Sequence, residues 1–121
     1  MKQYFRKHFG NKIFNCIQSS KSQFLYIKEN DRGVGEIISI QDKCHLTVEN
    51  KKLVEVFLIQ NENCVMNSTN GRQCDWLISS SNKLFFIEAK SQVKNMKRRG
   101  NARKDAYLQL ENTFSFYSLL I

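Results

Sequence analysis

Two carboxylates and an ammonium group lie close together in a stretch of sequence that has the pattern of a β-hairpin. Residues 76–78 and 84–87 are short apolar runs, and the serines and asparagine between them favour a turn. When this hairpin is folded, Asp75 falls opposite Ile87 or Glu88. Because side chains alternate along a strand, Glu88 and Lys90 share one face and Ala89 points the other way.

This arrangement predicts a site for a divalent metal and a polarised water. Carboxylate oxygens are the ligands that hard divalent cations prefer. The simpler interpretation is that Glu88 and Lys90 mark the exposed end of the strand and pair with each other or with solvent. A charge directly after four apolar residues is costly unless it is paired or holds a metal. With Asp75 placed across the hairpin, we favour a site.

The same residues resemble the signature of a known superfamily. Asp75, a spacer that contains a hairpin, and then Glu88-x-Lys90 look like the motif of the PD-(D/E)xK nucleases, which have the restriction-endonuclease-like fold. Residues 72–78, 86–90 and 109–113 are similar to those of small bacterial proteins of that superfamily. The resemblance covers about residues 64–113. Cys74 stands where the superfamily name has proline, and a long basic insertion follows the Glu-x-Lys strand.

The resemblance implies a role for each of these residues. Asp75 and Glu88, with the carbonyl group of Ala89, would bind Mg²⁺ or Mn²⁺. Lys90 would orient or help to deprotonate the attacking water and stabilise the scissile phosphate. Gln109 would face the site from the following helix, although it also reads as an ordinary polar flank. A further acidic ligand from the N-terminal half is common in the superfamily, and the sequence does not rank the candidates Glu36, Glu49, Glu55 and Glu62.

The positive charge of the chain is unevenly distributed. The 121 residues carry 19 lysines and arginines against 11 acids, a formal net charge of +8, which favours polyanion partners such as nucleic acid. Six basic side chains follow the Glu-x-Lys strand with no acid among them: Lys94, Lys97, Arg98, Arg99, Arg103 and Lys104. We expect them to contact phosphates, which positions nucleic acid without reading its sequence. A solvated loop is the alternative.

The chain is short enough to be one domain, residues 1–121. We expect an α/β fold, a restriction-endonuclease-like domain with a central mixed β-sheet of four or more strands flanked by α-helices. Further strand candidates are residues 24–27, 36–40, 45–48 and 53–59. Apolar spacing predicts a helix within residues 4–17, interrupted at Gly10. A second helix begins near Ala102, with an apolar stripe of Ala102, Ala106, Leu110, Phe114 and Tyr117.

Composition also bounds the cellular setting. No apolar run approaches the roughly 20 residues of a membrane span, and the basic N-terminus lacks the apolar core of a secretory signal. We therefore expect a cytoplasmic protein whose partner is not a membrane. The four cysteines form no CxxC pair, and we expect reduced, partly buried thiols. A zinc site can be drawn from Cys44, His45, Cys64 and Cys74, but their spacing does not support it.

These observations lead to a predicted function and two alternatives. The prediction is Mg²⁺- or Mn²⁺-dependent cleavage of phosphodiester bonds in DNA or RNA. One alternative is a non-catalytic protein that binds nucleic acid or regulates and keeps the nuclease fold. The other is a structural or protein-interaction module that forms a homodimer or binds a partner through the apolar C-terminus. The Asp, Glu and Lys together favour catalysis, because a pure binding protein does not need all three.

Overall fold

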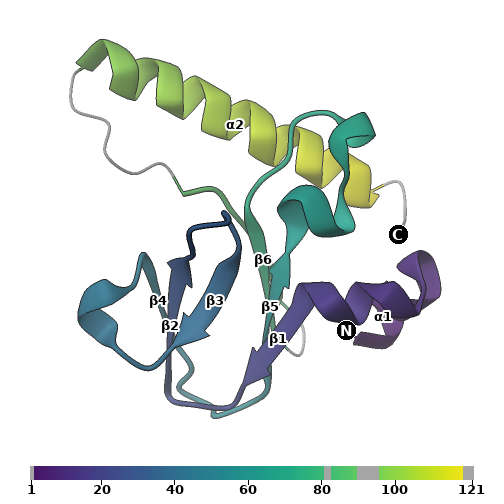
Figure 1. Cartoon of the computed structure of the whole chain (residues 1–121), viewed down its shortest axis with the longest axis vertical. Helices are drawn as coiled ribbons and strands as arrows, with labels where there is room; N and C mark the ends of the chain where they lie inside the picture. The colour runs from purple at the N-terminus through teal and green to yellow at the C-terminus, as the bar shows by residue number, and fades with distance from the viewer. Residues whose placement is uncertain (1, 81–82, 90–95, 119–121) are drawn as a thin grey trace.

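The computed structural model describes residues 2–80, 83–89 and 96–118 of the chain (Figure 1). Two α-helices lie near its ends, and seven strands and several short helical turns lie between them. The elements are, in chain order, α1 (Lys2–Phe9), η1 (Asn11–Cys16), β1 (Ile17–Ser20), β2 (Phe24–Glu29), β3 (Gly35–Ile38), η2 (Gln41–Lys43), β4 (Leu46–Glu49), β5 (Val56–Gln60), η3 (Asn61–Val65), η4 (Ser68–Asn70), β6 (Trp76–Ser80), β7 (Lys83–Ile87) and α2 (Met96–Ser118).

The strands form two separate sheets. Sheet A has four strands in the order β1-β5-β6-β7, and sheet B has three in the order β3-β2-β4. In Figure 1 sheet A lies in the middle, with sheet B on one side of it, α1 on the other, and α2 lying across one end. The expected α/β class is therefore confirmed.

The expected single mixed sheet is replaced by two antiparallel sheets. Every strand pair in the described part of the chain is antiparallel. Parallel neighbours need a crossover of a dozen or more residues, usually a helix. The links between β1, β2, β3 and β4 are too short for such a crossover, so the N-terminal half folds back on itself.

Sheet A is buried on both faces because its strands alternate two sets of apolar side chains. Leu58, Trp76 and Ile78 face sheet B and pack with Leu25 and Ile27. The alternating strand residues Ile59 and Leu77 point to the other face and pack against the helices. They belong to a second cluster of Phe5, Ile13, Cys16, Ile59, Val65, Met66, Cys74, Leu77 and Tyr117. This alternation follows from the two-residue period of a strand.

The two sheets are in close contact where Gly35 of β3 meets the buried indole of Trp76. A Cβ atom on Gly35 would lie only 2.5 Å from Trp76 Nε1. The Gly35 N–H donates to Gln60 Oε1 at 3.0 Å, and this bond ties β3 to the end of β5. Trp76 is 1% exposed, so its ring belongs to the core.

Four local expectations need adjustment. The second helix begins at Met96, well before the expected start near Ala102. The first helix does stop at Gly10, whose φ of 81° favours glycine, and Ile17 begins a strand instead of continuing the apolar stripe. Leu53 does not lie in the strand that was expected over residues 53–59. Its φ is 52° and its N–H donates to Asn50 in a turn, so β5 begins only at Val56. Phe114 lies outside the buried stripe of α2 and is exposed.

The helices in the described part of the chain lack the length and apolar character of a membrane span. Neither α1 nor α2 is apolar enough over sufficient length to cross a bilayer.

Substituting Gly35→Ala should destabilise the fold, because the rigid Trp76 ring cannot move away from the added methyl group. We expect a loss of about 1–3 kcal/mol in the free energy of unfolding, as for other overpacked positions. Urea denaturation monitored by tryptophan fluorescence measures this loss. Ser19→Ala, at an exposed position of β1, is the control and should change stability by less than about 0.5 kcal/mol. Equal stability of the two variants would contradict this packing.

Candidate functional site

The hairpin of β6 and β7 brings Asp75 and Glu88 to the same end of sheet A. Trp76 pairs with Ile87, and the register continues to Ser80 opposite Lys83. Asp75 precedes the first pair and Glu88 follows it. The expected adjacency of the two strands, and the expected position of Asp75 opposite Ile87 or Glu88, are confirmed.

Asp75 connects this end of the hairpin to the end of β5. Its Oδ2 atom accepts a hydrogen bond from the Ala89 N–H at 2.8 Å. Its backbone carbonyl accepts from the N–H groups of Asn61 at 3.0 Å and Glu62 at 3.3 Å. The Asp75 carboxylate is thus fixed next to the backbone of residues 88–89. These are the residues for which the sequence analysis predicts a metal site.

Glu88 lies on the helical side of sheet A. Its neighbours Ile87 and Ala89 both pack against the cluster that faces sheet B. Side chains alternate along an extended chain, so Glu88 points the opposite way, to the side where Phe86 packs against the helical core. The Glu88 side chain is half-buried there.

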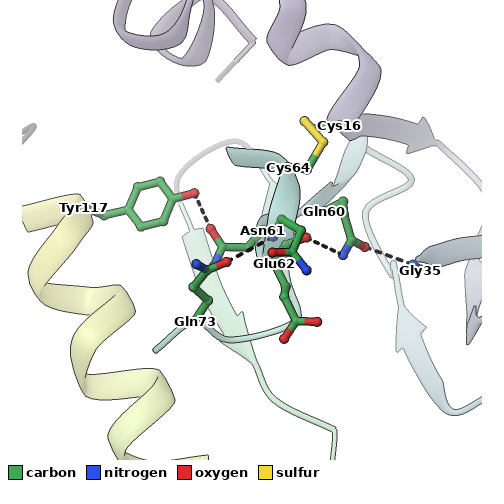
Figure 2. Close-up of a disulfide and its surroundings, with 9 residues drawn as sticks. Cys16, Gly35, Gln60, Asn61, Glu62, Cys64, Gln73 and Tyr117 are labelled. Carbon is green, nitrogen blue, oxygen red and sulfur yellow. Dashed lines mark hydrogen bonds between the residues drawn. A yellow bond between two sulfur atoms is a disulfide. The ribbon is translucent and has the colours of Figure 1, made fainter. Parts of the chain in front are cut away.

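Asn61 is a fully buried amide at the centre of this region (Figure 2). Tyr117, from the C-terminal end of α2, donates its hydroxyl to Asn61 Oδ1 at 2.8 Å. The Asn61 amide nitrogen donates to the Cys74 carbonyl at 3.0 Å and also contacts the sulfur of Met66. One side chain therefore joins η3, the residues before β6, and α2.

Thr113 holds the same segment from α2. The Cys74 N–H donates to Thr113 Oγ1 at 2.8 Å, and the Thr113 hydroxyl donates to the Gln109 carbonyl at 2.7 Å. Burial raises the pKa of the Cys74 thiol to about 11, and the nearby carboxylates of Glu88 and Asp75 act in the same direction, against the hydrogen bond with Thr113. Cys74 is therefore a protonated packing residue.

Gln109 and Glu62 share a surface pocket beside this segment. The pocket has a volume of about 450 Å³, and Asn63, Arg72 and Gln73 also line it. Within the described residues, the Oε1 atom of Gln109 is buried and has no hydrogen-bond partner. Buried acceptors are normally satisfied, so this oxygen is an acceptor that the described residues leave unused.

Glu62 is the acidic candidate that the structure brings next to Asp75. Its N–H bonds to the Asp75 carbonyl, whereas Glu36 lies on β3 and accepts from Asn30, and Glu49 ends β4 in sheet B. Glu55 is exposed just before β5. In the described part of the chain, no three His, Cys, Asp or Glu side chains are grouped closely enough to hold a metal ion.

Several predicted residues fall at the edge of what the structure describes. Lys90 and Lys94 lie outside the described residues. Lys97, Arg98 and Arg99 lie in the first turns of α2, and their side chains are likewise outside the description. Arg103 and Lys104 are exposed on α2, as a phosphate contact requires.

The cysteines correct one expectation. Cys16 and Cys64 form a disulfide that joins η1 to η3 across 48 residues of sequence, so they are not reduced thiols (Figure 2). Cys64 is thereby excluded from any zinc site. Cys44 and Cys74 carry free thiols. No motif in the sequence indicates this pairing, because it depends on how η1 and η3 meet in space.

Asn61 and Thr113 are positioning residues that the sequence did not reveal. Asn61 follows a buried strand and reads as a turn former. Thr113 belongs to the stretch 109–113 that resembles the superfamily, and it lies four residues after Gln109 on the same side of the helix, so two signals could have linked it to the site.

Comparison with families of proteins, with curated proteins and with solved structures finds no match to this chain.

Thr113→Val should destabilise the protein more than Thr113→Ser does. Valine keeps the shape but leaves the buried Cys74 N–H without an acceptor, at a cost of about 1–3 kcal/mol. Serine keeps the hydroxyl and removes one buried methyl group, at about 0.8 kcal/mol. Chemical denaturation of both variants measures the difference in the free energy of unfolding. A serine variant as unstable as the valine variant would contradict a stabilising role for the hydroxyl.

Thiol titration tests the assignment of the cysteines. Protein purified without reductant and unfolded in guanidinium chloride should show two reactive thiols, from Cys44 and Cys74, and four after reduction. In the folded protein near pH 8, Cys44 should react first, because Cys74 is buried and stays protonated at that pH. Four thiols without reduction would contradict the disulfide.

Proposed function

We propose that this chain is a metal-dependent nuclease of the PD-(D/E)xK type that hydrolyses phosphodiester bonds in nucleic acid. The observation that carries the proposal is the convergence of Asp75 and Glu88 at one end of the β6–β7 hairpin, with the Asp75 carboxylate bonded to the Ala89 N–H. The net charge of +8 supports a polyanion as substrate.

The donor groups at this end of the hairpin suit Mg²⁺ or Mn²⁺. Asp75 and Glu88 would hold the ion together with the Ala89 carbonyl, and all three offer oxygen atoms. Magnesium typically takes one or two carboxylates and keeps several waters, so a pair of acids is sufficient. The partnerless Oε1 of Gln109 is a further oxygen ligand or water acceptor on the helical side. When bound, the ion lowers the pKa of a water ligand and offsets the charge that develops on the phosphate.

The residues of the chain have distinct tasks in this proposal. Asp75 and Glu88 would hold the ion, which would supply the positive charge that the phosphate needs, and Asn61 and Thr113 keep Asp75 in place through the backbone. Lys90 directs the water and stabilises the phosphate charge. The water oxygen forms a bond to phosphorus, the bond to the leaving oxygen breaks, and that oxygen gains a proton.

Plasmid and single-stranded substrates incubated with Mg²⁺, Mn²⁺ or EDTA test this function. Wild-type protein should cleave with either metal and not with EDTA. Glu88→Gln and Asp75→Asn should each reduce the cleavage rate by at least about 100-fold, because even residues behind a metal ligand cost 10- to 100-fold. Glu49→Gln, an acid on β4 of sheet B, is the matched control and should retain wild-type activity.

Two results would contradict the proposal. Cleavage that survives in both Glu88→Gln and Asp75→Asn would place the active site elsewhere. Binding of nucleic acid by folded wild-type protein, with no cleavage under any metal, would favour a non-catalytic binding protein with the same fold. Circular dichroism of each variant separates loss of activity from loss of folding.

A further inference from the structure

The outer side of α2 exposes large apolar side chains. Tyr107 is 68% exposed and Leu108 44% exposed, whereas Thr113 and Tyr117 on the inner side are buried. Phe114 is also exposed, but its ring makes an edge-to-face contact with Phe86. Within the described residues Tyr107 has no such ring contact, so its packing does not explain its position.

Two cations lie one helical turn before Tyr107. Arg103 and Lys104 are four and three residues earlier, and side chains with this spacing are neighbours on a helix surface. With Tyr107 and Leu108 they line an open surface pocket of about 430 Å³. A flat exposed ring beside cations is the combination that single-strand binding sites use, with a base stacked on the ring and phosphates held by the charges.

The acid in this turn of the helix does not oppose an anion at this surface. Asp105 forms an ion pair with Arg72 at 2.9 Å. Each helical residue advances by about 100°, so Asp105 leaves the helix well away from Tyr107 and Lys104. Arg103 and Lys104 lie one turn before Tyr107, and the exposed Glu111 lies one turn after it, so cations outnumber acids around the ring by two to one. The chain as a whole carries a net charge of +8.

We infer that Arg103, Lys104 and Tyr107 form a contact site for single-stranded nucleic acid on the outer face of α2. A duplex keeps its bases stacked on one another, whereas a single strand can offer a base to the Tyr107 ring. Gln109 lies two residues further on and leaves the helix on the opposite side, so this surface is separate from the candidate active site. The inference requires a nucleic-acid partner but no cleavage, and it holds for an enzyme and for a binding protein.

Fluorescence anisotropy with a labelled oligothymidine and a labelled duplex of equal length tests this site. EDTA is present throughout, so that cleavage does not interfere. Tyr107→Ala and Tyr107→Leu should each weaken binding of the single strand by about 5- to 150-fold, the range measured for loss of one base–aromatic stack. Tyr107→Phe keeps the ring and should bind like wild type. Binding of the duplex should not change in any of the three.

The charged side chains give a second, independent readout. Replacing Arg103 and Lys104 with alanine should flatten the dependence of log affinity on log salt by about 1.4 for the single strand, since each phosphate contributes about 0.7. Phe24→Ala is the matched control for Tyr107→Ala. It removes an exposed aromatic ring from β2 of sheet B, and it should not change the affinity for the single strand.

The possible outcomes distinguish a single-strand site from a dimer interface. Undetectable binding of the single strand by wild type, or equal binding by wild type and Tyr107→Ala, would overturn the inference. Equal losses of affinity for the single strand and for the duplex in Tyr107→Ala would also overturn it. A dimer in sedimentation that Tyr107→Ala converts to a monomer would overturn it as well, and would assign this face to a second copy of the chain. Failure of wild type to cleave any substrate refutes the nuclease proposal alone and leaves this inference standing.

Discussion

The backbone of Cys74 and Asp75 is held on both sides by buried polar groups, and the arrangement of the helical half of the molecule depends on this. The carbonyl of Cys74 accepts from Asn61 and its N–H donates to Thr113, while the carbonyl of Asp75 accepts from the start of η3. A buried peptide group without a partner costs free energy, and these bonds are made only when β5, β6 and α2 meet in one way. Apolar contacts alone would permit α2 to slide or rotate, whereas this network fixes its register.

The network also explains why α2 has so little buried apolar surface in its middle turns. Its attachment combines the hydroxyls of Thr113 and Tyr117 with a group of rings near its C-terminal end, where Tyr117 contacts Phe5, Phe9 and Phe86. The preceding turns can therefore carry exposed Tyr107 and Leu108 without loss of anchoring. The same helix thus offers one side to the fold and the other to solvent.

Local patterns predicted the hairpin well and the rest of the site less well. The register of β6 and β7 follows from alternating side chains and a short turn, so Asp75 and Glu88 could be paired on sequence alone. The position of Glu62 beside Asp75 depends on η3 reaching the start of β6, which is a contact between distant segments. A sequence pattern contains no information on such a contact. The Cys16–Cys64 pairing was missed for the same reason.

Errors in the fold had equally specific causes. Leu53 continues an apolar alternation, but Asn50 bonds the carbonyls of Ser22 and Val54 and bends the chain before β5 can begin. The short links of β2, β3 and β4 favour antiparallel pairing, whereas the expectation of one mixed sheet came from the resemblance. The importance of Gly35 could not be predicted from the sequence. Its φ is not positive, and a side chain is excluded there only because the Trp76 indole packs against it.

The disulfide between η1 and η3 makes the whole of sheet B part of a covalent ring. Residues 17–63 lie between the two bonded cysteines, and they include β1, every strand of sheet B, and β5. A tension applied to the two chain ends therefore passes from Cys16 directly to Cys64 and does not pull on the strands in the ring. Under mechanical load, the hairpin and α2 would extend while sheet B stayed shielded, because every strand of sheet B lies in the ring and pairs only with strands that are also in it.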